Sequence, residues 1–567
     1  MPWVSACCKL RAALRVGALV TEPAVTAPLR GPAIVGTLPA PSLDASGHPM
    51  PRFGFDHSYA RDLPGASVSC QPATAPAPRL LYVNEPLAAE LGLDPAGWRG
   101  AVGDALFAGN ALPEDAQPIA QAYAGHQFGG FSPQLGDGRA LLLGELIDRQ
   151  GRRRDVAFKG SGRTPFSRGG DGRAAIGPML REVLIGEALH ALGIPTTRAL
   201  AVAATGEEIW RDRPLPGAVL TRVAASHLRV GTFQFFAVRG AVEPLRRLAD
   251  YAIARHDPTL AELGEGPARY LGLLRAVAQR QAELVAQWLN AGFIHGVMNT
   301  DNMAISGESI DFGPCAFLEA FDPAAVFSSI DHGARYAYGN QPAIARWNLA
   351  RFAEALLPLL VDDPRDLDDP GNEAAVQRAV AQAMAVIDAF PAWHAAALLR
   401  GQRAKLGLQA ATAADDEGDV ALARDWLALL QAQAVDHTLA WRRLADAAEG
   451  QVAPLAALLA EPAALQPWLV RWRARCAQDD AAAGLPDPDA AATARAARLR
   501  AVNPWIIARN QRVEEALEAA TDHGDLGPFE RLLAVLRQPF NEQPAHARYA
   551  EPAPAAVTAR YQTFCGT

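Results

Sequence analysis

The sequence has few cysteines, no long apolar run and no excess of positive charge. Its cysteines are too few and too scattered for a disulfide scaffold or a zinc cluster; they are Cys7, Cys8, Cys70, Cys315, Cys476 and Cys565. No apolar run approaches the roughly 20 residues that cross a bilayer. The formal charge of −8 argues against nucleic-acid binding through a generally basic surface. We therefore expect a monomeric cytoplasmic protein in a reducing compartment, with neither membrane nor nucleic acid as a partner.

Residues 1–50 form a segment of their own, rich in Ala, Pro, Val and Gly. The composition predicts a disordered extension. Three basic residues precede the first acid, Glu22, so an organelle-targeting peptide and a misplaced start codon are alternatives. The apolar stretch Val16–Val20 is shorter than the roughly 7–15 residues of a secretory core.

The rest of the chain changes character near residue 226. Residues 51–225 favour strands, at 80–83, 139–145, 155–159 and 218–223, with one internal helix over 181–192. A further hairpin is expected between 199–204 and 207–210, turning at Thr205-Gly206. Residues 226–542 read almost entirely as helix, and 543–567 form a Pro- and Ala-rich tail. The pattern predicts an α+β protein of two lobes with a cleft between them: a strand-rich lobe and an enlarged helical lobe.

Gly292–Gly313, GFIHGVMNTDNMAISGESIDFG, is a polar segment inside the helical part. Asn299, Asp301 and Asn302 form a short polar loop, a turn follows at Ser306-Gly307, and Asp311 opens an Asp-Phe-Gly. We expect a small hairpin with oxygen ligands on either side. Mg²⁺ prefers one or two carboxylates together with phosphate oxygens and water, so the segment suits a metal that carries nucleotide phosphates.

The strand-rich part supplies matching phosphate binders in a fixed order. Gly136-x-Gly138 allows close approach of backbone N–H groups, Lys159 ends an apolar strand, and Glu182 opens the next helix. Each has an ordinary alternative: a hairpin turn, a solvated strand end and a partner of the helix dipole. The series of glycine loop, strand lysine, helix glutamate, Asp-Asn and Asp-Phe-Gly is more specific, and it follows protein-kinase logic. No Walker A motif is present.

The usual catalytic aspartate of a kinase is missing. His295-Gly296 is followed by Val297, whereas Asp301 stands directly beside Asn302. The chain is thus either a binding-only pseudokinase or an enzyme that uses its nucleotide differently. Arginines in glycine-rich or strand-end positions favour the second reading, because a deeply held triphosphate would present its α-phosphorus. These are Arg139, Arg163, Arg168, Arg173, Arg222 and Arg229; for Arg163, Arg168 and Arg173 a solvated surface role is an equal alternative.

Several long segments closely resemble the selenoprotein O family of protein adenylyltransferases. They are FDHSYARDLPGASVSC, YAGHQFGGFSPQLGDGRA, KGSGRTPFSRGGDGRA, REVLIGEALHALGIPTTRAL and HGVMNTDNMAISGESIDFGPCAF. The resemblance spans about Phe53 to the C-terminus. It implies a protein-kinase-like fold that binds ATP in a flipped orientation and transfers AMP to Ser, Thr or Tyr hydroxyls of proteins.

The resemblance also implies a set of site residues. Asp301 is implied as the proton acceptor, Asn302 and Asp311 as ligands of Mg²⁺ or Mn²⁺, and Glu182 as the ion-pair partner of Lys159. Nucleotide contacts are implied for Gly136, Gly138, Arg139, Lys159, Asp171, Gly172, Arg222, Arg229 and Asp311. The family has a C-terminal selenocysteine or cysteine that can pair with a cysteine of the activation segment. Here Cys565 and Cys315 are the candidates, with two ordinary thiols as the alternative.

Other functions remain open at this point. Uridylyl transfer from UTP with Mn²⁺ is one, since no sequence feature indicates which nucleotide base is recognised. An ordinary phosphotransferase is a second, favoured by His295-Gly296 and Asn302 and disfavoured by Val297. A non-catalytic nucleotide-binding or redox scaffold is a third.

Overall fold

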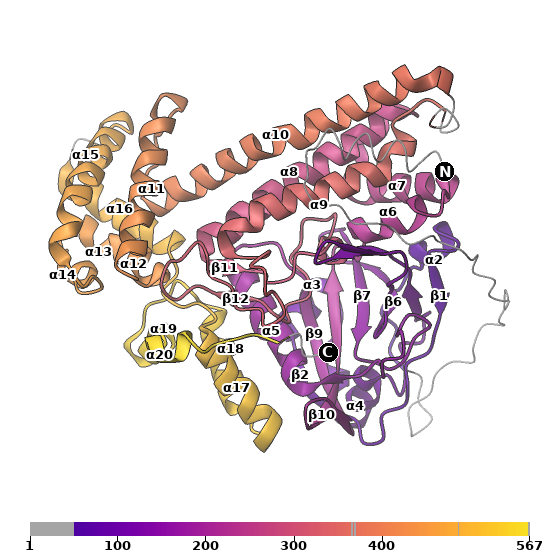
Figure 1. The fold of residues 1–567 in the computed structure, drawn as a ribbon. Coiled ribbons are helices and arrows are strands. Elements are labelled where there is room, and N and C mark those ends of the chain that lie inside the picture. The colour runs from indigo at the N-terminus through magenta and orange to yellow at the C-terminus, as the bar shows by residue number, and fades with distance from the viewer. Residues whose placement is uncertain (1–49, 364–366, 368–369, 486, 565–567) are drawn as a thin grey trace.

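The computed structural model describes residues 50–363, 367, 370–485 and 487–564. The expectations for residues 1–49 and for Cys565 therefore lie outside the described residues. Within the described part, no helix is long and apolar enough to cross a membrane. The fold is mixed α/β, with one large antiparallel sheet followed by a helical region (Figure 1).

The sheet has eight strands in the order β1-β3-β6-β7-β10-β9-β2, with β8 paired to β10. Their bounds are Ser67–Ser69 (β1), Arg79–Val83 (β2), Ile119–Gln121 (β3), Ala140–Ile147 (β6), Arg153–Lys159 (β7), Ala174–Ala175 (β8), Arg198–Trp210 (β9) and Pro214–Ala224 (β10). In the register, Lys159 lies opposite Leu220, and Ala157 lies opposite Arg222. Because opposed residues share a face and alternate residues repeat it, Lys159 and Arg222 project from the same face.

The expected hairpin over Thr205-Gly206 is wrong. Residues 198–210 form a single strand, β9, whose hairpin partner is β10, and the turn lies at 211–213. The register shifts between Glu208 and Ala204, so that residues 205–207 together oppose Gly217. Thr205-Gly206 is thus a bulge, in which Gly206 takes a φ of +77°.

The helices form two groups. The helices before and within the sheet are α2 (Ser58–Asp62), α3 (Glu85–Leu91), α4 (Ala101–Ala108) and α5 (Ile176–Ala191). Those after it are α6 (Val230–Ala237), α7 (Val242–His256), α8 (Pro267–Ala291), α9 (Gln341–Leu356), α10 (Glu373–Lys405), α11 (Asp416–Ala432), α12 (His437–Arg442), α13 (Leu444–Ala448), α14 (Ala453–Ala456), α15 (Gln466–Ala482), α16 (Pro488–Val502), α17 (Asn510–His523), α18 (Gly527–Leu536), α19 (Ala547–Ala550) and α20 (Ala555–Thr558). Helices α8, α9 and α10 run side by side, and α11–α16 gather at the end of α10 far from the sheet (Figure 1).

The sheet has a different apolar layer on each face. Side chains of α3, α4 and the 3-10 turn Pro95–Trp98 between them, including Trp98 and Phe107, pack with Val156 and Phe158 on one face. On the other face α5 packs against β9 and β10, and α17 and α18 cover the outer side of α5. Among the 16 residues of α5, 13 are buried, so this helix is enclosed between the sheet and the C-terminal helices.

Arg181 connects α5 to three other segments. Its guanidinium, buried in the described structure, donates to the carbonyl oxygens of Phe312 (3.2 Å) and Cys315 (2.6 Å). It also donates to Glu514 Oε1 on α17 (2.9 Å) and contacts the Tyr561 hydroxyl of the tail (3.3 Å). One side chain therefore fixes α5 relative to the segment that follows Asp311.

We expect Arg181→Leu to destabilise the protein by about 2–4 kcal/mol, because buried carbonyls lose charged hydrogen-bond donors. Arg213→Leu is the matched control: Arg213 also pairs with α17, through Asp522, but its side chain is 57% exposed. An exposed ion pair contributes less than about 1 kcal/mol. The measurement is the melting temperature of both variants, and equal losses would contradict the role given to Arg181.

Candidate active site

The segment expected to be a hairpin, residues 292–313, is paired differently in the structure. Gly307 N donates to Ala304 O (3.2 Å), so the expected turn is present, but its two arms pair with other segments. Ala304 bridges Arg229, and Ser309 bridges Thr196. The ends of the segment are closed by β11 (Phe293–Ile294) and β12 (Ala316–Phe317), which pair with each other. Both arms of the turn are therefore bonded to segments that adjoin strands or helices outside residues 292–313.

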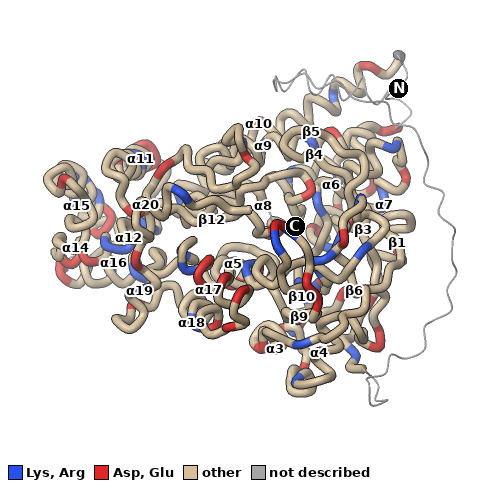
Figure 2. The backbone as a smooth tube through the Cα atoms, turned by 60° about the horizontal axis from the view of Figure 1, so that its bottom comes forward, with Lys and Arg blue, Asp and Glu red and all other residues tan. Residues whose placement is uncertain are grey.

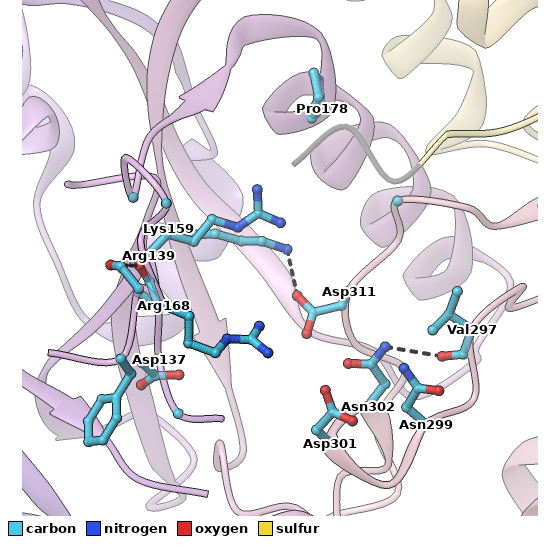
Figure 3. A pocket seen from close by; sticks show the side chains of 18 of the residues that line it. Asp137, Arg139, Lys159, Arg168, Pro178, Val297, Asn299, Asp301, Asn302 and Asp311 are labelled. Atoms are coloured by element: carbon cyan, nitrogen blue, oxygen red, sulfur yellow. Dashed lines mark hydrogen bonds and ion pairs between the residues drawn. The ribbon is translucent and has the colours of Figure 1, made fainter. Parts of the chain in front are cut away.

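A cavity of about 570 Å³ lies between the sheet and this segment. All twelve residues assigned above to nucleotide, metal, proton transfer or the ion pair line it: Gly136, Gly138, Arg139, Lys159, Asp171, Gly172, Glu182, Arg222, Arg229, Asp301, Asn302 and Asp311. Arg168 and Arg173 line it as well, but Arg163 does not. Figure 3 shows Asp137, Arg139, Lys159 and Arg168 on one side, facing Asp311, Asp301, Asn302 and Asn299.

Lys159 and Asp311 are joined across the cavity. Lys159 Nζ lies 2.8 Å from Glu182 Oε1 and 2.5 Å from Asp311 Oδ1. Glu182 Oε1 also accepts from the backbone N–H of Phe312 (3.0 Å). The strand lysine and helix glutamate of the sequence series therefore form an ion pair, and that pair reaches the Asp-Phe-Gly directly.

Asp311 is surrounded by positive charge. Besides Lys159, Arg222 Nη1 lies 2.8 Å from its Oδ1, and Arg229 Nη1 lies 3.8 Å from its Oδ2. Burial alone would raise the pKa of this carboxyl, but the three cations hold it well below its usual value. Asp311 also has a φ of +65°, an uncommon conformation for a residue with a side chain.

Arg222 is oriented from behind by a buried histidine. His227 donates from Nδ1 to Asp155 Oδ2 (2.9 Å) and accepts on Nε2 from Arg222 Nε (3.2 Å). This arrangement requires neutral imidazole, because Nε2 has to be free of a proton. Burial lowers the pKa of His227 to about 4, with Arg222 and Arg229 adding to the effect and Asp155 opposing it.

Asp301 lies in a single 3-10 turn, Thr300–Asn302, at the opposite end of the cavity from Lys159. Burial raises the pKa of its carboxyl to about 6, against a hydrogen bond from Gln127 that lowers it. Its Oδ2 accepts from Gln127 Nε2 (2.9 Å), whereas the buried Oδ1 has no hydrogen-bond partner. A buried, unpartnered carboxylate oxygen is suited to accept a proton from a bound group.

The two glycines of the loop before β6 have a packing role that sequence reasoning missed. A Cβ at Gly136, where φ is +84°, would collide with the ring of Phe166, and a Cβ at Gly138 would lie 3.1 Å from the Phe166 carbonyl oxygen. Residues 160–173 lie on this loop, with Thr164 Oγ1 donating to Asp137 O (2.5 Å). Gly136 and Gly138 thus allow two loops to form one wall of the cavity.

No sequence motif had selected Arg211, Gln127 or Phe128, yet all three line the cavity. Arg211 forms a two-pronged ion pair with Asp171, at 2.7 and 3.1 Å. Arg211 lies in the β9–β10 turn, which the sequence did not predict because a hairpin turn was expected at Thr205-Gly206 instead. Arg139, by contrast, has a buried Nη1 without a partner, and this donor is available to an anion.

The donors fit a metal that arrives with phosphate. Within the described residues, no group of three or more His, Cys, Asp or Glu side chains is arranged as a protein-only metal site. Asn302 donates through Nδ2 to Val297 O (3.1 Å), which leaves its amide oxygen free on the side of Asp311 (Figure 3). One carboxylate and one amide oxygen leave most coordination positions to phosphate and water, as Mg²⁺ prefers.

Cys315 is fully buried and its Sγ donates to Phe312 O (3.1 Å). Burial raises the pKa of the thiol to about 12, so the reactive thiolate is disfavoured in this conformation. The tail passes close by, since Thr563 Oγ1 donates to Pro314 O (2.8 Å). The pairing of Cys315 with Cys565 remains a prediction, because Cys565 is outside the described residues.

Comparison with known proteins places these residues in a wider context. A family model described as protein adenylyltransferase SelO matches residues 55–537. A protein nucleotidyltransferase YdiU of Chromobacterium violaceum is 58% identical over 505 residues, covering 89% of this chain and all of the relative. Proteins of the same name from Cereibacter sphaeroides and Rhizobium etli are 59% and 54% identical, covering 91% and 92% of this chain and 100% and 98% of the relatives.

The His227 arrangement predicts a pH dependence of stability. The folded-state pKa of about 4 lies below the ordinary 6.5, so the unfolded chain binds more protons between these values. Stability associated with His227 is complete above pH 6.5 and is lost as the pH falls towards 4. We expect His227→Gln, measured by chemical denaturation at a series of pH values, to flatten the slope in this window. An unchanged slope would show that other buried groups account for it.

Proposed function

Because this chain belongs to the SelO family of protein adenylyltransferases, we propose that it transfers AMP from ATP to Ser, Thr or Tyr hydroxyl groups of proteins. The enzyme class, nucleotidyltransferase, follows from the family and from the names of its relatives. What we propose beyond this class is that the nucleotide is ATP, that the acceptor is a hydroxyl group of a protein, and that the nucleotide binds in the reversed orientation.

The observation that supports it best is the unequal distribution of charge in the cavity. Its lining includes seven cationic side chains, Arg139, Lys159, Arg168, Arg173, Arg211, Arg222 and Arg229, against five carboxylates, Asp137, Asp171, Glu182, Asp301 and Asp311. The whole chain carries a net charge of −8, and along the backbone tube in Figure 2 the Lys and Arg positions are interspersed with Asp and Glu positions. Positive charge is therefore concentrated where a triphosphate would bind.

In the proposed reaction the acceptor oxygen forms a bond to the α-phosphorus, and the bond from that phosphorus to the bridging oxygen of the β-phosphate breaks. Pyrophosphate leaves with the electron pair of the broken bond. The hydroxyl proton passes to Oδ1 of Asp301. Arg139, with its unpartnered donor, and Lys159 neutralise the charge that develops on the leaving group. Most of the rate enhancement then comes from position and charge, as in other phosphoryl transfers.

Asn302 and Asp311 are the residues that would hold Mg²⁺ or Mn²⁺. When bound, the metal supplies charge neutralisation for the phosphates. Asp311 is suited to this because its carboxylate stays ionised although it is partly buried. Its Oδ1 is engaged by Lys159 and Arg222, whereas its Oδ2 has only the distant Arg229 contact of 3.8 Å. Oδ2 is therefore the oxygen open to a cation.

The proposal includes a protein-kinase-like arrangement with the nucleotide reversed. The Lys159–Glu182 pair, which connects a central strand to the helix packed on the sheet, supports the kinase comparison. Val297 supports the reversal, because no carboxylate stands where a kinase would activate the acceptor of a γ-phosphoryl group. An acceptor activated by Asp301 instead meets a nucleotide whose α-phosphorus faces that residue.

Label transfer tests the reaction. We expect ATP labelled on the α-phosphate to mark protein, either the chain itself or an added bacterial extract, and ATP labelled on the γ-phosphate not to do so. Pyrophosphate should be the released product. Label from the γ-phosphate with ADP as the product would instead establish a phosphotransferase, and the proposed function would be wrong.

Asp311→Asn tests the charge at the site, and it should lower α-label transfer by at least about a hundredfold, since a positioned electrostatic group contributes this much. Asp388→Asn is the matched control, because Asp388 is 56% exposed and pairs only with Arg346 on the surface. The readout is the initial rate of protein labelling. Full activity of Asp311→Asn would exclude a catalytic role for this carboxylate.

A further inference from the structure

A short hairpin lies against the turn that carries Asp301. It consists of β4 (Gly125–Gln127) and β5 (Gly130–Ser132), which are joined by Phe128 and Gly129 and lie outside the large sheet. Three consecutive hairpin residues donate to the turn and to Asn299 just before it: His126 N to Thr300 Oγ1 (2.7 Å), Gln127 Nε2 to Asp301 Oδ2 (2.9 Å) and Phe128 N to Asn299 Oδ1 (3.0 Å). The hairpin therefore determines the position of the turn residue by residue.

The two carboxylate oxygens of Asp301 have different surroundings beside the hairpin. Gln127 donates to Oδ2, whereas Oδ1 is buried without a partner. Gly125 and Gln127 are alternate residues of one strand and so lie on the same face. A Cβ on Gly125 would come within 2.8 Å of Oδ1. The strand thus holds one carboxylate oxygen through Gln127, and the missing side chain of Gly125 allows its backbone to lie close to the other.

Phe128 occupies an unfavourable conformation at the tip. Its φ is +52° and that of Gly129 is +86°, so both central residues of this two-residue turn are left-handed. Such turns favour Asn-Gly, and a bulky residue with positive φ is a genuine outlier. Nevertheless Phe128 is 39% exposed, lines the cavity and rests edge-on against Tyr336 (5.1 Å between ring centroids). Local strain of this kind collects at functional sites.

We propose that the β4–β5 hairpin forms the acceptor side of the site. Gln127 is a positioning residue that fixes the Asp301 carboxylate with Oδ1 towards the acceptor hydroxyl. Phe128 is a specificity-determining contact for apolar atoms of the protein segment that carries this hydroxyl. The inference rests on the proposed function and adds to it which element receives the protein.

More cationic side chains face Asp301 from across the cavity than lie at its own end, where Arg229 donates to the Asp301 carbonyl oxygen (3.1 Å) and Arg335 lies near Gly129, so we place the phosphates across the cavity and the polypeptide beside the hairpin. The cationic residues Arg139, Lys159 and Arg168 face Asp301 from the other side of the cavity (Figure 3), where an anion is favoured. Two lining residues, Phe128 on the hairpin that contacts the Asp301 segment and Ile330, are exposed apolar side chains. An extended segment with an apolar residue next to its hydroxyl residue fits this rim.

The first test separates the Gln127 hydrogen bond from simple packing. Gln127→Ala and the isosteric Gln127→Glu both remove the N–H donor, and only the second keeps the volume. We expect both to lower the rate of α-label transfer to protein about ten- to a hundredfold, because a misoriented base costs this much. The affinity for α,β-methylene-ATP with Mg²⁺, measured by calorimetry, should stay within about threefold, since the hairpin does not face the phosphate side.

The second test concerns Phe128. Phe128→Asn places the favoured residue at this turn position, so folding should be unimpaired while label transfer to protein falls at least about fivefold. Phe128→Tyr keeps the ring and should keep the activity. Ser132→Ala, on the same hairpin but outside the cavity lining, is the matched control and should match the unaltered protein.

Several results would overturn the inference. They are full activity of Gln127→Glu, full activity of Phe128→Asn, equal loss in Phe128→Asn and Phe128→Tyr, or a loss of nucleotide affinity that parallels the loss of transfer. Failure of the proposed function looks different, because the unaltered protein would then transfer no α-label at all.

Discussion

The partly buried carboxylate of Asp311, with 23% of its side chain exposed, is the constraint on which the rest of the site depends. An ionised carboxylate inside a protein is costly unless cations and hydrogen bonds compensate it. Here the compensation comes from three places in the sequence: Lys159 on β7, Arg222 on β10 and Arg229 just before α6. The sheet register brings the first two to one face, so the antiparallel pairing of β7 and β10 is itself part of the charge balance. The same cations that stabilise the ionised Asp311 would contact the phosphates of the proposed nucleotide substrate.

Helix α5 connects the surroundings of Asp311 to the outer parts of the molecule. Glu182 completes the charge balance by accepting from both Lys159 and the Phe312 N–H. One residue earlier, Arg181 holds the carbonyls of Phe312 and Cys315 and reaches α17 and the tail. Two neighbouring side chains of opposite charge thus fix the backbone after Asp311 from its N–H and its C=O groups. This explains how a residue with an uncommon φ of +65° is maintained, since its neighbours determine the backbone on both sides.

Much of the site could be predicted because short local sequence motifs indicate its chemistry. The glycine loop, the strand lysine, the helix glutamate and the Asp-Phe-Gly each have a recognisable composition, and the structure brings them to one cavity. The residues that were missed act through tertiary contacts. Gln127 and Phe128 belong to a three-residue strand whose significance depends on its packing against residues 299–301, 170 positions and more away in sequence. Arg211 was missed because Gly206 was interpreted as a turn, whereas a bulge in a longer strand satisfies the same glycine preference. The sequence predicted the turn at Gly307. Its two arms pair with Arg229 and Thr196, and this pairing depends on tertiary contacts that no local sequence pattern indicates.

The position of Val297 clarifies why the carboxylate lies at residue 301 in the proposed reaction. Val297 is buried and lines the cavity, and its carbonyl oxygen accepts from Asn302 Nδ2 (3.1 Å). Its contribution is therefore the backbone, which turns the amide oxygen of Asn302 towards Asp311, while its apolar side chain adds no charge near the proposed metal ligands. Placing the acid at residue 301 moves it to the end of the cavity beside the β4–β5 hairpin, away from Lys159. Arg139, Lys159 and Arg168 thus face Asp301 from the other side of the cavity, and in the proposed reaction the acceptor hydroxyl would enter beside the β4–β5 hairpin, apart from the phosphates.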